Sequence, residues 1–160
     1  MNRSLNFFLA LLRIAAGLSL LMSGVTKVGW FSSSTALHQR LTEWSQAAPY
    51  AFVAGYDRAM LAHAGWLARV VVLGELGLGA LLLLGFLTPV AALLAFVMVA
   101  QFQFASGQMF TKQYLYGQSG LVYLLTYLVI FAGRAGQSLG LDGLIGRSLA
   151  GGGGGGAPKR

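Results

Sequence analysis

The chain has 160 residues, of which 56% are hydrophobic and 9% charged, and its mean hydropathy is +0.69. Soluble domains carry about 25% charged residues, so these charges are too few to cover the surface of a soluble protein, and the composition predicts an integral membrane protein in a lipid bilayer. The net charge of +7 comes from scattered Lys and Arg residues with no basic run, and we therefore expect no nucleic acid partner.

The first apolar segment, residues 5–28, exceeds the roughly 20 residues that a spanning helix needs. Arg3 precedes it, as a basic residue precedes the core of a signal peptide, but Arg13 interrupts the run, which continues past the usual length of such a core. We therefore expect an uncleaved spanning helix with a charge at membrane depth.

Residues 29–65 are too many for a loop within a bundle and predict a helical extramembrane cap between the first two spanning helices. One helix is expected to begin near Ser34 or Thr35 and to end before Pro49. A second, amphipathic helix is expected over residues 53–64. The simplest function of this cap is that of a lid without chemistry of its own.

Three further apolar segments follow, at residues 66–87, 89–105 and about 117–133. Gly85 can end the second helix, and Pro89 can occupy the first turn of the third, which predicts a helical hairpin. The predicted fold class is all-α, an integral membrane four-helix bundle with both termini on one side.

Residues 1–147 are expected to form a single membrane domain, in which residues 140–146 are turn-rich. Residues 148–160 contain six consecutive glycines and predict a disordered tail. The basic residues divide evenly between the two sides, so the positive-inside rule gives no orientation. We expect the termini in the cytoplasm and the chain in a bacterial or archaeal cytoplasmic membrane.

Arg13 and Glu75 are the charges expected at membrane depth, where each costs roughly 2.5–3.5 kcal/mol unless it has a partner or a polar cavity. With a rise of about 1.5 Å per residue, the two side chains fall within one helical turn in depth, and Gln101 lies near the same level. We predict a buried Arg13–Glu75–Gln101 cluster. A purely structural pair and a proton-handling or quinone-binding site remain open alternatives.

Glycines surround the acid at Gly74, Gly77 and Gly79, and Gly17 and Gly24 lie one heptad apart on the first helix. Small residues let membrane helices approach closely, so this pattern predicts tight packing. Its spacing does not match a dinucleotide-binding fingerprint.

The chain contains no cysteine, which excludes disulfides, thiolate metal sites and iron–sulfur ligation by its own residues. Its histidines, His38 and His63, lie in the cap, away from the helices on which axial haem ligands would be needed. A metal site that adds Glu43 and Asp57 to them remains an alternative, although the spacing matches no standard ligand motif. We expect no haem or metal on this chain.

Aromatic residues alternate with glutamines between the third and fourth helices. This pattern is typical of an interfacial aromatic belt, and it also suits a quinone ring, which needs stacking and hydrogen bonds to two carbonyl oxygens. The residues predicted to contact a quinone cofactor are Gln101, Gln103, Tyr114 and Tyr116.

Several short motifs together resemble the DoxX/DoxD family. They are LLRIAAGL at 11–18, SGVTK at 23–27, GELGLG at 74–79, LGFLTP at 84–89 and GLD at 140–142. The resemblance extends over about residues 5–145. The long cap and the ending are similar to the DoxD branch, the small membrane subunit associated with thiosulfate:quinone oxidoreductase.

This resemblance implies an oxidoreductase in which electrons pass from thiosulfate, or another reduced sulfur compound, to a quinone. It gives Glu75, Arg13 and Lys27 as the catalytic polar set, and a cationic rim of Lys27, Arg69 and Lys112 suits an anionic substrate. A second redox subunit is the expected partner, with a homo-oligomer as the other possible assembly. The alternative function is a non-catalytic membrane anchor or assembly subunit of a redox complex.

Overall fold

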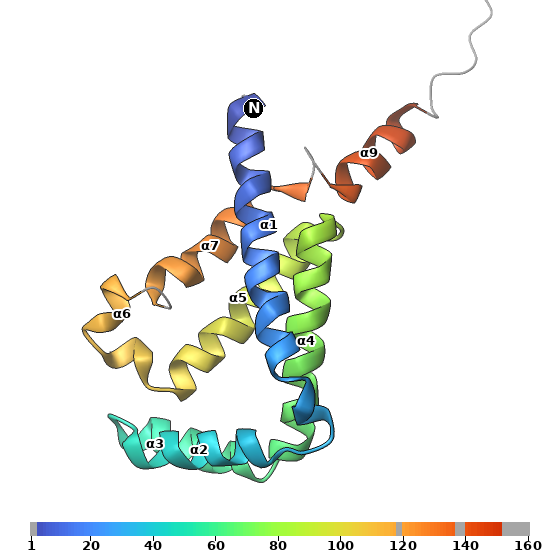
Figure 1. Ribbon diagram of the computed structural model, residues 1–160. Helices are drawn as coiled ribbons and strands as arrows, with labels where there is room; N and C mark the ends of the chain where they lie inside the picture. Colours follow the sequence, from blue (N-terminus) through green and yellow to red (C-terminus); the bar gives the residue numbers. More distant parts are fainter. Residues whose placement is uncertain (1–2, 118–119, 137–139, 152–160) are drawn as a thin grey trace, which may run out of the picture.

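The computed structural model describes residues 3–117, 120–136 and 140–151, and within these ranges the regular elements are all helical. Figure 1 shows α1 and α4 side by side, α5 and α7 inclined to them, and α2 and α3 lying across one end of the bundle. The elements in chain order are α1 (Arg3–Thr26), η1 (Val28–Phe31), α2 (Thr35–Ala47), α3 (Ala51–Leu61), α4 (Ala64–Leu84), α5 (Thr88–Ala105), η2 (Gln108–Phe110), α6 (Gln113–Tyr116), α7 (Leu121–Ala132) and α9 (Leu141–Gly151).

Three of these helices, α1 from Ser4 onward, α4 and α5, are long and apolar enough to cross a membrane. The fourth apolar helix, α7, has 12 residues, or about 18 Å, which is shorter than a hydrocarbon core of about 30 Å. It is also shorter than predicted, because a turn in which the Gly120 amide donates to the Gly117 carbonyl occupies the start of the expected segment. The prediction of an all-α membrane protein is confirmed.

The predicted hairpin between α4 and α5 is also confirmed. Gly85 ends α4 in the left-handed conformation, with φ of 65°, and the Phe86 amide donates a hydrogen bond to the Leu81 carbonyl at 3.0 Å. Pro89 lies in the first turn of α5, where its missing N–H costs nothing. The two helices therefore leave the turn as antiparallel neighbours.

The cap is helical, as predicted, and packs against the first half of α4. α2 begins after Ser34, and α3 begins and ends slightly earlier than expected. Leu37 and Leu41 point from α2 into a cluster with Trp30 of η1 and with Ala68 and Val72 of α4. This cluster fixes the cap over the end of the bundle that Figure 1 draws at the bottom.

Glycine allows α1 and α4 to pack backbone against backbone. A Cβ atom on Gly79 would lie 2.7 Å from the Leu21 nitrogen, and one on Gly17 would lie 2.9 Å from the Leu83 nitrogen, closer than real Cβ atoms approach. A Cβ atom on Gly24 would lie 2.9 Å from side-chain atoms of Leu76 and 3.0 Å from its backbone nitrogen. The predicted role of these glycines is confirmed, whereas Gly77 faces open space.

The end of the chain differs from the prediction. Residues 141–151 form α9, although residues 140–146 were expected to be turns and residue 148 to begin a tail. The remainder of that tail, residues 152–160, lies outside the described residues. The N-terminal end of α1 and α9 both lie at the end of the molecule opposite the cap (Figure 1).

Candidate functional site

A buried ion pair joins α1 to α4. Lys27 Nζ lies 2.6 Å from Glu75 Oε1 and 2.7 Å from Oε2. Ser23 completes the group, since its hydroxyl donates to Glu75 Oε1 at 3.1 Å and accepts from Lys27 Nζ at 2.6 Å. The side chains of Lys27 and Glu75 are 16% and 6% exposed, so the two charges interact through a medium less polar than water.

The packing of α1 on α4 explains how these residues meet. Ser23 and Lys27 are four residues apart at the end of α1 and therefore lie on one face. Gly24, between them, allows Leu76 of α4 to approach within 3 Å of the position of a Cβ atom. Glu75 is thereby brought within reach of the Lys27 ammonium group.

Arg13 does not join this group, and the predicted Arg13–Glu75–Gln101 cluster is wrong. Arg13 lies beside Gly85, ten residues along α4 from Glu75, which is about 15 Å at 1.5 Å per residue. Arg13 and Glu75 would lie at one depth only if both helices began at the membrane surface. In the structure, the first turns of α1 extend beyond the end of α4, as Figure 1 shows.

Arg13 instead holds the opposite end of the bundle together. It is fully buried, and its Nη1 donates a hydrogen bond to the Ala135 carbonyl at 3.2 Å. The acid whose charge acts on it is Asp142. A Cβ atom at Gly85 would collide with the guanidinium group, so this turn requires glycine for space as well as for its backbone angle.

Asp142 is a polar residue that the sequence analysis noted only as part of a closing motif. Its carboxylate caps α5: Oδ1 accepts a hydrogen bond from the Leu87 amide at 2.8 Å, and Oδ2 accepts one from the Thr88 amide at 2.9 Å. The Asp142 amide in turn donates to the Gly85 carbonyl at 2.9 Å. Arg13 and Asp142 therefore form a structural clamp between α1, the α4–α5 turn and α9.

The Lys27–Glu75 pair lies in a cavity of about 220 Å³, here called the polar chamber. Arg40 of α2 also lines it and is a second cation that the sequence analysis missed, whereas Arg69 and Lys112 of the predicted rim do not line it. Both Lys27 Nζ and the Arg40 guanidinium lie over the Trp30 ring, at 5.9 and 5.7 Å from its centre. The chamber thus holds two cations and one acid.

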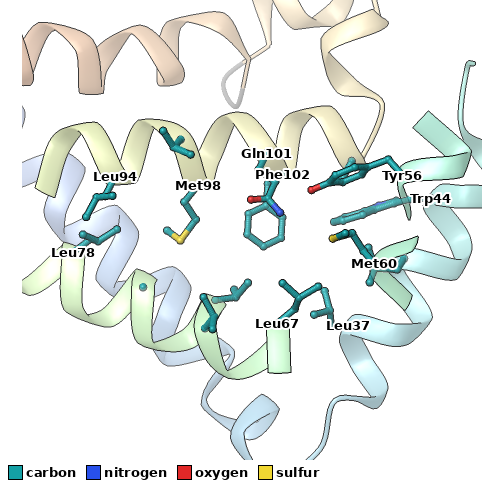
Figure 2. Close-up of a pocket in the computed structure, with 16 residues that line it drawn as sticks. Leu37, Trp44, Tyr56, Met60, Leu67, Leu78, Leu94, Met98, Gln101 and Phe102 are labelled. Carbon is teal, nitrogen blue, oxygen red and sulfur yellow. The ribbon is translucent and has the colours of Figure 1, made fainter. Parts of the chain in front are cut away.

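A second cavity, here called the apolar cavity, has a volume of about 370 Å³ and lies between α4 and α5 beneath α2 and α3. Figure 2 shows Trp44, Tyr56 and Gln101 gathered at the cap end and Leu78 and Leu94 at the opposite end. Three of its residues also line the polar chamber and form the partition between the two spaces: Trp44, Met98 and Phe102.

The four residues predicted to contact a quinone lie in different places. Gln101 lines the apolar cavity, and Gln103 lines the polar chamber, where its Nε2 donates to the Gly120 carbonyl at 3.2 Å. Tyr114 and Tyr116 line neither cavity, and Tyr116 is 75% exposed. The structure therefore brings Gln101 and Gln103 toward the site and leaves the two tyrosines outside it.

Asp57 in the cap is a further buried acid. It has no exposed surface, and within the described part of the chain neither of its carboxylate oxygens has a hydrogen-bond partner. Burial therefore raises the pKa of Asp57 to about 6. It lines neither cavity, but it is adjacent in sequence to Tyr56, which lines the apolar cavity together with Gln101.

Apolar spanning helices around a buried ion pair, with a helical cap over one end, define a small α-helical membrane protein. The DoxX family profile matches residues 8–107, and the chain belongs to the DoxX family. This range includes α1, the cap, α4 and α5, and so contains both cavities' principal walls. Searches of curated proteins and of solved structures found no match.

Proposed function

We propose that this chain is the membrane subunit of an oxidoreductase that passes electrons from a reduced sulfur compound, such as thiosulfate, to a membrane quinone. The observation that carries the proposal is the Lys27–Glu75–Ser23 group, buried in a polar chamber that shares a wall with an apolar cavity. The resemblance to the DoxD branch supplies the sulfur compound as substrate class.

Glu75 is the residue to which we assign proton handling. Its carboxylate accepts hydrogen bonds from both Lys27 and Ser23, so its charge is balanced in a region with little water. A proton arriving at Glu75 weakens the attraction to Lys27, and a departing proton restores it. The proton of the proposed reaction is therefore assigned to the Glu75 carboxylate, which lines the polar chamber.

Lys27 and Arg40 are assigned to an anionic substrate. With Glu75, they give the chamber a formal charge of +1, which favours entry of a small anion. Arg40 is exposed at the chamber wall, whereas Lys27 lies deeper and is paired. Arg40 is therefore the first cation that an anion approaching from the cap side meets.

The apolar cavity fits a quinone. Its volume of about 370 Å³ falls within the roughly 300–1,000 Å³ of small-molecule sites, and apolar side chains make up most of its wall. When bound, a quinone accepts two electrons and two protons and becomes a quinol. The chain itself contributes binding, exclusion of water and the proton held at Glu75.

A partner subunit belongs to this proposal. Without cysteine, the chain has no thiol on which to hold sulfur or electrons. In this proposal, a second protein supplies the redox centre that this chain lacks. We expect full activity only in a complex.

The test is thiosulfate-dependent reduction of a quinone analogue by membranes with and without this protein. Glu75→Gln keeps the size of the side chain and one acceptor oxygen but removes titration and the charge, so a proton-transfer role predicts a loss of rate larger than the loss of protein level. Asp142→Asn is the control, because Asp142 belongs to the structural clamp. The rate of quinone reduction by this variant should follow its protein abundance.

Equal activity in membranes that lack the protein would end the enzymatic proposal. If the Glu75→Gln rate merely follows abundance while a redox partner co-purifies in fixed ratio, the chain is a membrane anchor and Glu75 is a structural partner of Lys27.

A further inference from the structure

We propose that the apolar cavity between α4 and α5 is the site at which the quinone ring binds, with the Gln101 amide and the Tyr56 hydroxyl as its hydrogen-bonding groups. This assignment rests on the proposed function and adds a location, a binding orientation and two ligand-facing residues. It moves the quinone away from Tyr114 and Tyr116, which lie outside both cavities.

The wall of the cavity selects a neutral ligand. Of the sixteen residues that line it, none carries a charge, and the polar side-chain groups belong to Trp44, Tyr56 and Gln101. An anion such as thiosulfate would lose its hydration there without a cation to replace it, which is costly. The charged compound therefore belongs to the polar chamber and the neutral one to the apolar cavity.

The two ends of the cavity differ, and this difference orients an amphiphilic ligand. Aromatic and polar side chains lie at the cap end, whereas Leu78 and Leu94 lie at the other end (Figure 2). Leu94 and Val97 are 52% and 54% exposed, so this end opens toward the hydrocarbon that surrounds the spanning helices. A ring at the cap end with an isoprenoid tail leading into the bilayer matches this distribution.

Gln101 and Tyr56 can serve both forms of the ligand. Both side chains line the cavity, and together they possess three N–H and O–H donors. These donors can serve a carbonyl oxygen of the oxidised ring, and the lone pairs of the same groups can accept from the hydroxyl of the reduced ring. Gln101 lies in the last part of α5, at the level of the cap helix that carries Tyr56.

The partition places a ring in this cavity next to the proton-handling group. Phe102 contacts Trp44 edge to face, with ring centres 6.3 Å apart, and Lys27 Nζ lies 5.8 Å from the centre of the Phe102 ring. Phe102 therefore lines both the apolar cavity and the polar chamber. A ring beside Phe102 is separated from the Lys27–Glu75 pair by the side chains of the partition alone.

Tryptophan fluorescence provides the test, because quinones quench indole emission at short range and Trp44 lines the cavity. The purified full-length chain in detergent is titrated with a short-chain ubiquinone analogue, without a sulfur compound or partner. We expect saturable quenching, retained in Trp66→Phe and lost in Trp44→Phe. Trp66 lies at the start of α4 and is 65% exposed.

Cavity-filling variants locate the bound ring. Gly74→Leu inserts a side chain into the cavity against the flexible end of Met98, whereas Gly77→Leu on the same helix enters open space. We expect the Kd from saturable quenching to rise at least about tenfold in Gly74→Leu, which is equivalent to about 1.4 kcal/mol of binding free energy. The Kd of Gly77→Leu should not change. Val97→Phe, with Leu93→Phe as its outward-facing control, repeats the comparison on α5 if Gly74→Leu fails to fold.

Tyr56→Phe and Gln101→Met remove the hydrogen-bonding groups and should each weaken binding about three- to tenfold, as expected for the loss of one hydrogen bond. Quenching that never saturates, or that is unchanged in both filling variants, would overturn the assignment. Saturable binding without thiosulfate-dependent turnover would reject the proposed function and keep the site. Turnover that is unaffected by the filling variants would keep the function and reject the site.

Discussion

Lys27 and Glu75 form an ion pair at the junction of α1 and α4, with the ammonium nitrogen within 2.7 Å of both carboxylate oxygens. Lys27 comes directly after the last turn of α1, so its side chain extends from the end of one spanning helix to the middle of another. The negative charge of an acid at membrane depth is thus balanced by the positive charge of a lysine on the cap side. Arg13 lies at the opposite end of the bundle, where it donates to the Ala135 carbonyl.

A double-mutant cycle tests the pair. Lys27→Met and Glu75→Gln should each lower thermal stability in detergent, since removing one partner of a buried pair costs roughly 3–5 kcal/mol, and the double variant should lose less than the sum. Lys112→Met, which removes an exposed cation, is the control and should change little. Additive losses in the cycle would mean that the two side chains do not interact.

The clamp at the other end is tested at Asp142. Asp142→Ala removes the cap of α5, worth about 0.5–2 kcal/mol, and also takes a carboxylate away from the buried Arg13. Asp142→Asn keeps one acceptor oxygen and should be milder. Melting temperatures should therefore fall in the order wild type, Asp142→Asn, Asp142→Ala. An unchanged melting temperature for Asp142→Ala would contradict the clamp.

The close packing of α1 on α4 predicts opposite effects of alanine at two glycines on one helix. Gly79→Ala places a methyl group against the Leu21 backbone and should cost about 1–3 kcal/mol. Gly77→Ala faces open space and should be neutral or stabilise by up to about 1 kcal/mol through helix propensity. Thermal unfolding of the two variants in the same detergent makes the comparison, and equal behaviour would argue against the packing.

Asp57 predicts how stability depends on pH. Its pKa in the folded protein is raised to about 6 from an unfolded value near 4, so the folded state holds this proton more tightly. The resulting stabilisation is full below about pH 4 and is lost as the pH rises through about 6; its size is about 3 kcal/mol at most. Asp57→Asn removes this titration.

The measurement is the melting temperature of wild type and Asp57→Asn between pH 4 and 8. The two proteins should be similar near pH 4, and the variant should be the more stable above pH 6. A constant difference across this range would show that Asp57 does not titrate within it.

The sequence alone was sufficient for the main elements of the fold. Apolar runs at residues 66–87 and 89–105 predicted α4 and α5, and the glycine and proline between them predicted the hairpin, because backbone geometry and hydrogen bonding in lipid are local requirements. The cap was predicted from its length and helical spacing. α9 was missed because its glycines favour turns, and its first residues are held by contacts distant in sequence.

The sequence also identified the residues with charge at membrane depth, since any such charge needs a partner. It did not identify the partners. The offset between α1 and α4 decides them, and that offset depends on Gly17 and Gly79 meeting backbone to backbone, which is a tertiary contact. The predicted partner of Glu75 was Arg13, which lies beside Gly85, ten residues further along the chain than Glu75. The observed partner is Lys27.

What the sequence by itself determined is therefore the class of protein, its helices, and Glu75 as the acid that must be balanced within the membrane. What only the tertiary structure decided is that Lys27 balances it, that Asp142 serves Arg13, and that α4, α5 and the cap enclose an apolar cavity beside the polar chamber. The physical reason is that helix formation and membrane insertion depend on neighbouring residues. Pairing and cavity formation depend on how far one helix slides and tilts against another.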